Sequence, residues 1–391
     1  MRDVAVVTHD IEGRGGVASM TYFLYEALQD TGGYRPRIVS LALSSADEDS
    51  VRFLAPTSWT RGVRTTERTH RGVQHTHVGG WGVEVEPFRY RPRPALDEVL
   101  SEFDLVQFVT GTPSWAYAAR DVASPVFLWT ATTVWEDRET RLKNQSGPRG
   151  WWRRTMTRRA QVYERHALEE VNEVFALSNY THDNLQTQFS VDSTVAPQGV
   201  DADRFQPVLE PREDYILTVS RINDPRKRIP LLLRSYAEAR QQCEAVPALY
   251  VVGDQPNAGI RETARELGIA DHVQFMGRRP PNELVELYQH ALCFVLSSDE
   301  EGLGIVIQEA MACGRPVVST RSGGPETLIV DDETGILTPV DDAEALRDGM
   351  LRLVGDATLR QKMGKASRER VEEKFAEGVA REPFLEVYEK Y

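Results

Sequence analysis

The chain has 391 residues, 41% hydrophobic and 27% charged, which is enough for two or three soluble globular domains with ample core. Its formal net charge of −13 argues against nucleic acid as a general partner. The three cysteines show no Cys-x-x-Cys spacing, and no apolar run approaches the ~20 residues that span a bilayer. The apolar run near the amino terminus is too short to be the core of a signal peptide. We therefore expect a cytoplasmic protein with free thiols.

The amino-terminal segment is typical of a phosphate-binding turn. Residues 4–8 form a short apolar run that predicts a buried strand, glycines follow, and residues 17–28 have a helical pattern. Gly13, Gly15 and Ala18 satisfy the pattern G-x-G-x-x-A, which is weak evidence alone. The loop is a dinucleotide site, a loop that faces a diphosphate across a cleft, or a turn that needs glycine dihedrals.

Further strands are expected in the first half at residues 37–43, 105–110, 126–130 and 174–178, with a helical pattern at 115–121. Their alternation with helices predicts a doubly wound parallel sheet. Residues 44–94 are polar and read as irregular or short-stranded.

Residues 141–165 are strongly basic in an otherwise acidic chain. Against the single acid Glu164 they carry Trp151, Trp152 and eight cations, namely Arg141, Lys143, Arg149, Arg153, Arg154, Arg158, Arg159 and Arg165. Such a mixture indicates a peripheral contact with an anionic membrane that helps to hold an anionic or lipid-linked acceptor. The alternative is a solvated helix with its tryptophans in the core, which the lack of a clean amphipathic stripe favours.

A domain junction is expected at residues 195–207, which glycine and proline punctuate, followed by a polar linker at 209–214. Asp201-Ala202-Asp203 has the D-x-D spacing of some metal sites, but without flanking apolar strands it indicates a turn. We expect one domain over residues 1–200, with a carboxyl-terminal helix of 376–391 packing back on it, and a second over 208–375.

The second half repeats the alternation. Strands are expected at 215–220, 249–253, 273–277, 293–296 and 335–339, and helices at 229–240, 261–267, 282–290, 305–313, 343–354, 358–375 and 380–391. This order predicts a second parallel sheet, whose ligands would bind beyond the carboxyl ends of its strands.

The most informative stretch is 297–318. Three acids ending at Glu301 precede the turn Gly302-Leu303-Gly304, and a helix follows that contains Glu309. Glycine amides and a helix amino terminus form an anion site, while carboxylates accept hydrogen bonds from hydroxyls. This favours a nucleotide whose ribose and sugar are both held; the alternative is a capped helix with solvated acids.

A cationic loop follows the strand at 215–220 and contains Arg221 and Lys227. Two cations beyond a strand end, at the same edge as Glu301, suit a diphosphate that must be neutralised as it leaves. A solvated basic loop is the alternative.

Together these motifs resemble the retaining glycosyltransferase family 4. Glu301 and Glu309, with seven residues between them, match its paired glutamates, and Arg221 and Lys227 match its cationic loop with one extra residue between them. Gly15-Gly16 matches its amino-terminal glycine loop. The surrounding EGLGIVIQEAMACGRPVV and SGGPETLI, and the junction Gly199-Val200-Asp201, also fit. The resemblance covers nearly the whole chain.

The resemblance implies a GT-B fold of two Rossmann-like domains facing a deep cleft, and a hexosyltransferase that uses a nucleoside-diphosphate sugar, UDP or GDP, without cofactor or metal. Arg221, Lys227 and the Gly16 amide would stabilise the departing diphosphate. The implied donor contacts are Glu301 and the amides of Gly302, Leu303 and Gly304 for the sugar, Glu309 for the ribose, and the backbone near Arg278 for the base.

Two departures from the family pattern stand out. Residues 129–133 contain no histidine where the family often has one, although His9 follows the first strand, and Gln198 stands where asparagine is usual. No carboxylate is placed as a covalent nucleophile, so we expect front-face attack with retention. Alternatives are a non-catalytic sugar-nucleotide-binding protein and an NAD-dependent oxidoreductase that uses Gly13, Gly15 and Ala18.

Overall fold

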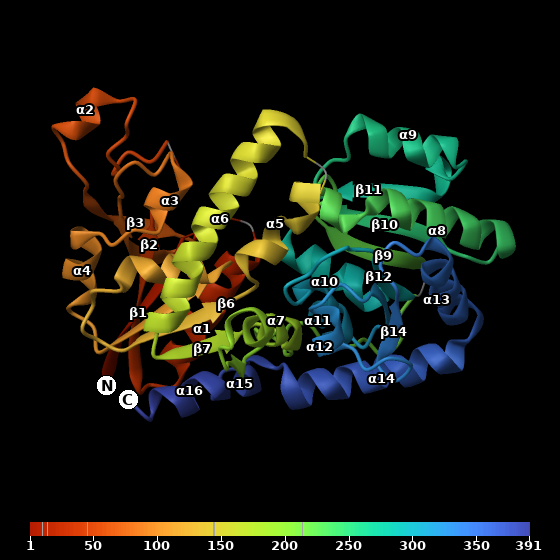
Figure 1. Ribbon diagram of the computed structural model, residues 1–391. Helices are drawn as coiled ribbons and strands as arrows, with labels where there is room; N and C mark the ends of the chain where they lie inside the picture. The colour runs from red at the N-terminus through yellow and green to blue at the C-terminus, as the bar shows by residue number, and fades with distance from the viewer. Residues whose placement is uncertain (10, 14, 45, 144, 213) are drawn as a thin grey trace. The chain divides into compact units, whose positions relative to one another are not determined.

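The computed structural model describes residues 1–9, 11–13, 15–44, 46–143, 145–212 and 214–391, without the side chains of 140, 141 and 143. The chain forms two compact units. Unit 1 comprises Met1–Gln198 and Arg381–Tyr391, and unit 2 comprises Gly199–Ala380. The carboxyl-terminal residues therefore return to the unit that contains the amino terminus (Figure 1).

The sheet of unit 1 has the strand order β3-β4-β2-β1-β5-β6-β7-β8 within the described residues, and its pairs are parallel except β3 with β4. Its strands are β1 (Arg2–Thr8), β2 (Tyr34–Leu41), β3 (Thr65–His70), β4 (Val73–Val78), β5 (Leu105–Thr110), β6 (Val126–Thr130), β7 (Glu173–Ala176) and β8 (Thr194–Val195). The central strands are buried apolar runs because helices cover both faces of a parallel sheet.

The helical elements of unit 1 connect these strands. They are α1 (Gly16–Asp30), α2 (Pro56–Trp59), α3 (Glu86–Arg89), α4 (Pro94–Leu100), the 3₁₀ helix η1 (Pro113–Ala119), α5 (Val134–Lys143), α6 (Gly147–Glu170), α7 (Asn179–Phe189) and α16 (Glu382–Tyr388). The helical pattern expected at 115–121 corresponds to η1, which begins and ends two residues earlier and whose seven residues are all buried.

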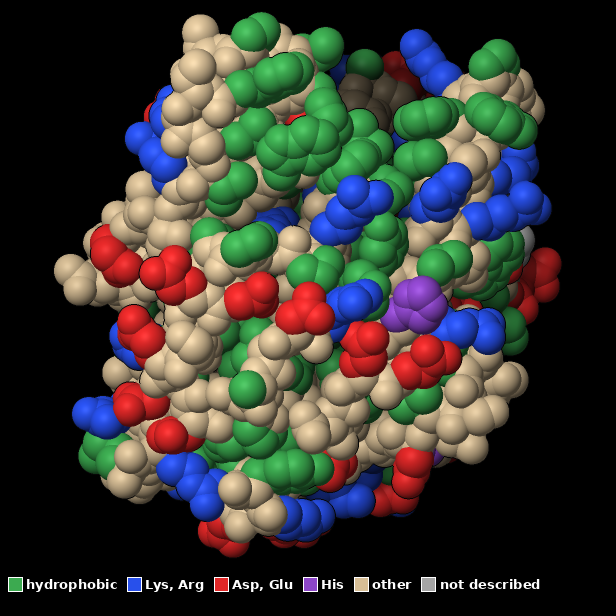
Figure 2. Space-filling model, turned by 60° about the vertical axis from the view of Figure 1, so that its left-hand side comes forward, with side chains coloured by type: hydrophobic (Ala, Val, Ile, Leu, Met, Phe, Trp, Pro, Cys, Tyr) green, Lys and Arg blue, Asp and Glu red, His purple; other side chains and the backbone are tan. Residues whose placement is uncertain are grey.

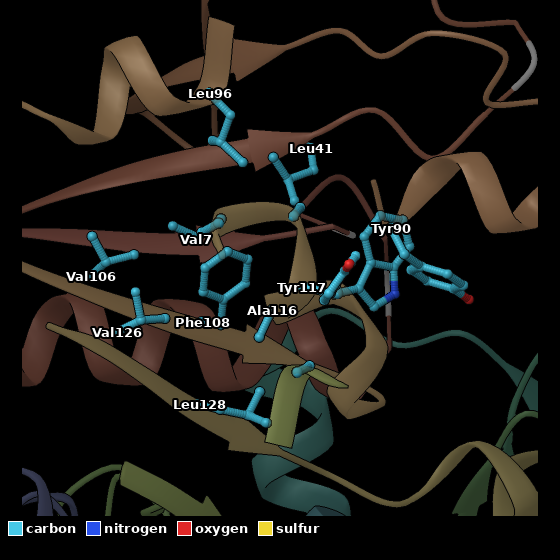
Figure 3. Packing of buried hydrophobic residues seen from close by; sticks show 14 of the residues in the cluster. Val7, Leu41, Tyr90, Leu96, Val106, Phe108, Ala116, Tyr117, Val126 and Leu128 are labelled. Carbon is cyan, nitrogen blue, oxygen red and sulfur yellow. The ribbon is translucent and has the colours of Figure 1, made fainter. Parts of the chain in front are cut away.

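The core of unit 1 lies between its sheet and the helices beside it. Val7, Phe108 and Leu128 from three neighbouring strands point toward the same apolar layer, which Leu96 of α4 also joins (Figure 3). The aromatic side chains of Tyr90 and η1 close one end of this layer. The interval 44–94, expected to be irregular or short-stranded, holds the antiparallel hairpin β3–β4 and two short helices.

The sheet of unit 2 is wholly parallel within the described residues, in the order β11-β10-β9-β12-β13-β14. Its strands are β9 (Tyr215–Ser220), β10 (Ala248–Gly253), β11 (Val273–Gly277), β12 (Cys293–Leu296), β13 (Val317–Thr320) and β14 (Gly335–Thr338). Because all six run the same way, the loops after β9, β10, β11 and β12 emerge at one edge, which is where α/β sheets bind ligands.

Helical elements pack on this second sheet around its own apolar core. They are η2 (Pro225–Lys227), α8 (Ile229–Gln242), α9 (Ala258–Glu266), η3 (Ala270–His272), α10 (Pro281–His290), α11 (Ile305–Ala312), α12 (Pro325–Leu328), α13 (Ala343–Gly355), α14 (Ala357–Lys374) and α15 (Glu377–Ala380).

The carboxyl-terminal segment differs from the single helix expected at 380–391. It is divided into α15, which belongs to unit 2, and α16, which belongs to unit 1. In unit 1 the Tyr388 hydroxyl donates a 2.8 Å hydrogen bond to Gln107 of β5, and Arg2 of β1 donates to the Tyr388 carbonyl at 2.5 Å. These two contacts hold α16 against the strands of unit 1.

Candidate active site

The loops after β9 and β12 are held together by backbone and side-chain hydrogen bonds. The two strands are neighbours in the sheet, so their loops emerge side by side. The Asp299 amide donates to the Arg226 carbonyl at 2.8 Å, and the Ser297 hydroxyl donates to the Lys227 carbonyl at 2.9 Å. The cationic loop after β9 (residues 221–228) and the loop after β12 (residues 297–304), about 70 residues apart in sequence, therefore form one surface.

An ion pair lies at the centre of this surface. The Lys227 Nζ is 2.5 Å from the Glu301 Oε1, and the side chains are 11% and 12% exposed. The same carboxylate oxygen accepts a 2.6 Å hydrogen bond from the Ser298 hydroxyl. The lysine ammonium has three donors, so it can hold Glu301 and still offer a proton to an anion.

The other charges of the two loops are paired across the same junction. Arg228 lies 3.2 Å from Asp299 and also pairs with Asp341, and Arg226 lies 3.9 Å from Glu300. The acids at 299 and 300 thus join a network and are not simply solvated. Their pairing fixes the backbone on either side of Lys227 and Glu301.

Arg221 is half exposed at the rim of this network. Its guanidinium is 3.2 Å from Asp224, which also binds Arg226 at 3.1 Å. Burial opposes ionisation of Asp224, but the hydrogen bonds and charge of Arg226, with that of Arg221, outweigh it and lower its pKa. Asp224 therefore holds one nitrogen of the Arg221 guanidinium, while the rest of this half-exposed group is accessible to an anionic ligand.

A glycine turn places backbone amides at the start of α11. Gly304 has a φ of 93°, which favours glycine, and it is the amino-terminal cap of α11. The Leu303 side chain is buried, so this residue presents only its backbone. The turn that follows β13 supports this glycine turn through two backbone hydrogen bonds. The Glu301 amide donates to the Ser322 carbonyl, and the Gly324 amide donates to the Glu301 carbonyl, both at 2.8 Å.

Glu309 lies in α11 and is held by an aromatic hydroxyl. Tyr288 of α10 donates a 2.6 Å hydrogen bond to the Glu309 Oε2. Burial raises the pKa of Glu309 to about 7, while the Tyr288 hydrogen bond acts in the opposite direction. The sequence singled out Glu309 but not Tyr288, Ser298 or Gly324, because their partners are set by packing between elements that are distant in sequence.

Arg278 follows β11 at the same edge of the sheet. Its side chain is half exposed and donates a 2.7 Å hydrogen bond from Nε to Asp254, which follows β10. The structure thus places Arg221 and Lys227 after β9, Glu301 after β12 and Arg278 after β11, all at the same edge of one sheet. No contact that is described joins Arg278 to the Lys227–Glu301 pair.

The glycine loop belongs to unit 1. Gly15 caps α1 and Gly16 is its first residue, as the amino-terminal pattern predicts. A methyl group at Gly16 would meet no atom within 4 Å. Packing among the described residues therefore does not require glycine at this position, which is consistent with a role toward a ligand.

His9 follows β1 and is held within unit 1. Its ring stacks on Trp115 with centroids 4.4 Å apart, and its Nδ1 has no partner among the described residues. Burial, with the charge of Arg89, lowers the pKa of His9 to about 3, so the ring is neutral.

The segment 129–133, which has no histidine where the family often has one, begins at the end of β6. Its Trp129 indole donates a hydrogen bond to the Ala196 carbonyl at 2.9 Å and is part of the core.

Two groups of acidic side chains have spacings or positions typical of metal ligands. Asp201 accepts hydrogen bonds from the amides of Asp203 and Arg204, so the D-x-D motif is a turn, as the sequence indicates. Among the described residues, Asp47, Asp49 and His77 have ligand atoms within 4.8 Å of one another. Both aspartates already bind the Arg68 guanidinium, at 3.0 and 2.8 Å, so a cation would have to displace it.

The basic segment forms the end of α5 and most of α6. One face of α6 is buried at Gly150, Thr157, Ala160, Glu164, Ala167 and Leu168. Trp151 and Trp152 lie on the other side and are 66% and 55% exposed, so the expectation that these tryptophans lie in the core is wrong. The molecular surface has regions where basic and hydrophobic side chains lie side by side, as in the upper right of Figure 2.

Two parallel α/β units, with a cationic loop and a glutamate-glycine turn at the ligand edge of the second, define a GT-B glycosyltransferase fold. The family model of "Glycosyltransferase Family 4" matches residues 14–204, and that of "Glycosyl transferases group 1" matches residues 200–370. Together they span both units, and the chain belongs to this family of group 1 glycosyltransferases.

Similar curated proteins are bacterial glycosyltransferases. A GDP-mannose-dependent α-(1-6)-phosphatidylinositol monomannoside mannosyltransferase of Mycolicibacterium smegmatis is 32% identical over 56% of this chain and 62% of its own. A D-inositol 3-phosphate glycosyltransferase of Corynebacterium diphtheriae is 44% identical over 28% of this chain and 25% of its own. The chain thus matches less than two thirds of the length of either relative.

Solved structures share the whole fold. Sucrose-phosphate synthase from Thermosynechococcus elongatus has a TM-score of 0.74 at 20% identity, covering 100% of this chain and 99% of its own. Anabaena HepE, solved in complex with UDP and glucose, has a TM-score of 0.71 at 16% identity over 100% of both chains.

None of the described helices is long and apolar enough to cross a membrane.

Proposed function

We propose that this protein transfers a hexosyl group from a nucleoside-diphosphate sugar, with UDP or GDP as the carrier, to a hydroxyl acceptor. The observation that carries the proposal is the Lys227–Glu301 pair at 2.5 Å, beside the glycine turn that opens α11. It combines a cation and backbone amides for phosphate with carboxylates for hydroxyls. The relatives named above are nucleotide-sugar or glycosyl transferases, which supports the same class.

In this proposal the donor lies along the ligand edge of unit 2. Arg221 and Lys227 contact the diphosphate, Glu301 and the amides of residues 302–304 contact the sugar, and Glu309 accepts hydrogen bonds from the ribose. The backbone near Arg278 contacts the base. Gly15 and Gly16 of unit 1 supply amides to the diphosphate.

The chemical step that we propose is front-face substitution with retention. The bond from the anomeric carbon to the phosphate oxygen breaks, and the acceptor oxygen bonds to the same face of that carbon. The acceptor proton passes to the leaving phosphate, whose developing charge the cations of the loop after β9 stabilise without a metal ion. An NMR spectrum showing inverted configuration at the anomeric carbon of the product would contradict this step.

The test is release of nucleotide from UDP-, GDP-, ADP- and dTDP-sugars by wild type and Glu309→Gln. We expect release from one donor and a large loss in the variant, which keeps the side-chain volume but not the charge. Exposed Glu369→Gln in α14 is the matched control and should behave as wild type. Absence of both release and binding for every donor would overturn the proposal.

A second candidate is a non-catalytic sugar-nucleotide-binding protein, which the absence of a histidine at 129–133 favours. Its signature would be tight donor binding without turnover over a broad set of acceptors. An NAD-dependent oxidoreductase has no support in the family assignment and leaves the Lys227–Glu301 pair unused. Protection from unfolding by NAD but not by nucleoside diphosphates would revive it.

We also propose that residues 141–165 make a peripheral contact with an anionic membrane at its cytoplasmic face. The supporting observation is that Trp151 and Trp152 are exposed beside arginines, as in interfacial segments. Co-sedimentation with phosphatidylglycerol vesicles at low salt should fall in the Trp151→Ala, Trp152→Ala double variant and at high salt. Exposed Trp59→Ala is the control, and equal sedimentation of all three proteins would contradict the contact.

A further inference from the structure

Unit 1 contains a pocket that the donor site does not use. It has a volume of about 390 Å³ and is lined by Val63, Gly80, Trp81, Phe88, Arg91, Pro92, Arg93, Pro94 and Ala95. Most of these residues belong to the connection between β4 and α4. A volume of this size lies in the usual range of small-molecule sites.

The pocket lies on the ligand edge of its sheet. Strand β4 is parallel to β2, and β2 is parallel to β1, so their carboxyl ends meet at one edge. Gly80 and Trp81 come directly after β4, and the glycine loop comes after β1. A ligand held beside Trp81 would therefore be on the side of unit 1 from which its strand-end loops project.

An aromatic cluster forms the apolar wall. Trp81 packs on Phe53 and Phe88 with ring centroids 4.6 and 5.5 Å apart, and Phe53 packs on Phe88 at 5.4 Å, all edge to face. Trp81 remains 50% exposed despite these contacts. The three rings hold one another in place, so a ligand ring or alkyl chain meets a preorganised surface at low entropic cost.

A buried guanidinium forms the floor. Arg93 is 5% exposed, and its two terminal nitrogens donate only to backbone carbonyls, those of Val78, Gly79, Arg89 and Ala42. Its Nε has no partner among the described residues, and no carboxylate within those residues forms a salt bridge with it. Burial lowers the pKa of Arg93 to about 10, and the charge of Asp47 acts in the opposite direction, so the guanidinium stays cationic at neutral pH. Its positive charge lies beneath the pocket and favours an anion above it.

A second cation stands at the rim. The Arg91 guanidinium lies over the Phe88 ring at 4.3 Å, and its Nε donates weakly to the Tyr163 hydroxyl at 3.4 Å. None of the nine lining residues is acidic, although the chain as a whole carries a net charge of −13. The pocket thus combines an aromatic wall with local positive charge.

We propose that this pocket binds the apolar part of the sugar acceptor, and that the acceptor is a small anionic amphiphile. Its ring or alkyl chain packs on Trp81 and Phe88, and its carboxylate or phosphate pairs with the exposed Arg91, while the buried charge of Arg93 attracts it through space. The word "acceptor" rests on the proposed function, whereas binding in the pocket does not.

The test uses 1-anilinonaphthalene-8-sulfonate, a fluorescent aromatic anion, with the full-length protein. We expect saturable binding of one probe per chain in wild type. Decanoate, decanol and decyltrimethylammonium, each below its micelle concentration, then compete for the site. Decanoate should displace the probe about tenfold more effectively than either of the others, because only its head group pairs with the arginines. Equal displacement by all three would overturn the anionic specificity.

Variants locate the binding. Trp81→Ala and Arg91→Gln should each weaken probe binding about five- to tenfold. Exposed Trp59→Ala and Arg234→Gln, which lie outside the pocket, should change it less than about twofold. Since Arg91 is exposed, Arg91→Gln decides the question if Trp81→Ala does not fold. Wild-type binding in both pocket variants would overturn the proposal.

Nucleotide release measured on the same samples separates this inference from the proposed function. Nucleotide release without probe binding would contradict ligand binding in the pocket and would support the proposed transferase activity. Probe binding without nucleotide release from any donor would support a site for amphiphiles and would contradict the proposal that its ligand is a sugar acceptor. Vesicles containing phosphatidylglycerol form a last arm, since displacement by vesicles but not by monomeric decanoate would assign the site to membrane lipid and exclude a small acceptor.

Discussion

The pair formed by Lys227 and Glu301 shows what one contact adds to two separate predictions. Each residue was assigned from its own loop, the lysine to phosphate and the glutamate to sugar. At 2.5 Å they are also partners of each other, largely out of solvent. Removing one partner therefore has a structural cost as well as a chemical one, because it leaves the other charge buried.

We expect Lys227→Met to lower the free energy of unfolding by about 3 kcal/mol, the lower end for breaking a buried pair. Adding Glu301→Gln should recover part of this loss, since the uncompensated carboxylate is then gone. Chemical denaturation measures both. The exposed pair Lys365–Glu369 provides a control, and Lys365→Met should cost less than about 0.5 kcal/mol. A double variant less stable than Lys227→Met would contradict this explanation.

Glu309 predicts a pH dependence of donor binding. Its pKa of about 7 means that the carboxylate, which we propose accepts ribose hydrogen bonds, becomes protonated in slightly acidic solution. Nucleoside diphosphate affinity, measured by calorimetry from pH 5.5 to 8.5, should therefore fall as the pH drops below about 7. Tyr288→Phe removes a hydrogen bond that favours the charged form, so the curve should move to higher pH. Tyr236→Phe, whose hydroxyl binds the Pro247 carbonyl, should leave it in place.

The stability of the unliganded protein should change with pH in the opposite sense. The pKa of Glu309 is raised from 4.5 to about 7, so the folded state holds this proton more tightly than the unfolded state. The contribution is fully favourable below about pH 4.5 and is lost as the pH rises through about 7. Glu309→Gln should remove this part of the slope, and an unchanged slope would show that Glu309 does not titrate there.

At the scale of elements, the start of α11 depends on a turn that follows a different strand. A Cβ at Gly324 would lie 2.3 Å from the Cα of Leu303, so only glycine lets the two turns approach this closely. The amide of Gly324 also donates to the Glu301 carbonyl. The sequence shows the glycines of both turns but not that one supports the other.

Gly324→Ala should push the turn at 302–304 away and weaken donor binding at least about tenfold, with a loss of stability of a few kcal/mol from overpacking. Gly355→Ala in α13 is the matched control, because a methyl group there meets nothing within 4 Å. That variant should be neutral or slightly stabilising. Thermal unfolding and donor titration measure the two effects, and unimpaired donor binding in Gly324→Ala would contradict the supporting role.

At the scale of the whole molecule, each unit has its own sheet and core. Most candidate site residues of unit 2 lie in the loops at 221–228 and 297–304, which the turn at 322–326 supports, and these three segments are far apart in sequence. Hydrogen–deuterium exchange with and without saturating UDP or GDP should show slowed exchange in these loops. The opposite edge of unit 2, at the amino ends of β9 and β12, should change little. Protection confined to that opposite edge would place the donor elsewhere.

The sequence by itself determined the class of fold and supplied most residues of the candidate site, for a local reason. Apolar runs bounded by glycine and proline report strands whatever they pack against, and β6 and β11 match their expected bounds. Chemistry at a strand end needs particular residue types at particular spacings, and this pattern selected the candidates Glu301, Glu309, Arg221 and Lys227. Only the tertiary structure decided which of these touch, that Tyr288 holds Glu309, that Trp151 and Trp152 are exposed, and that Arg93 is buried beside Trp81. These facts depend on contacts between segments distant in the chain, because strand order and packing, and not spacing along the sequence, decide which side chains meet.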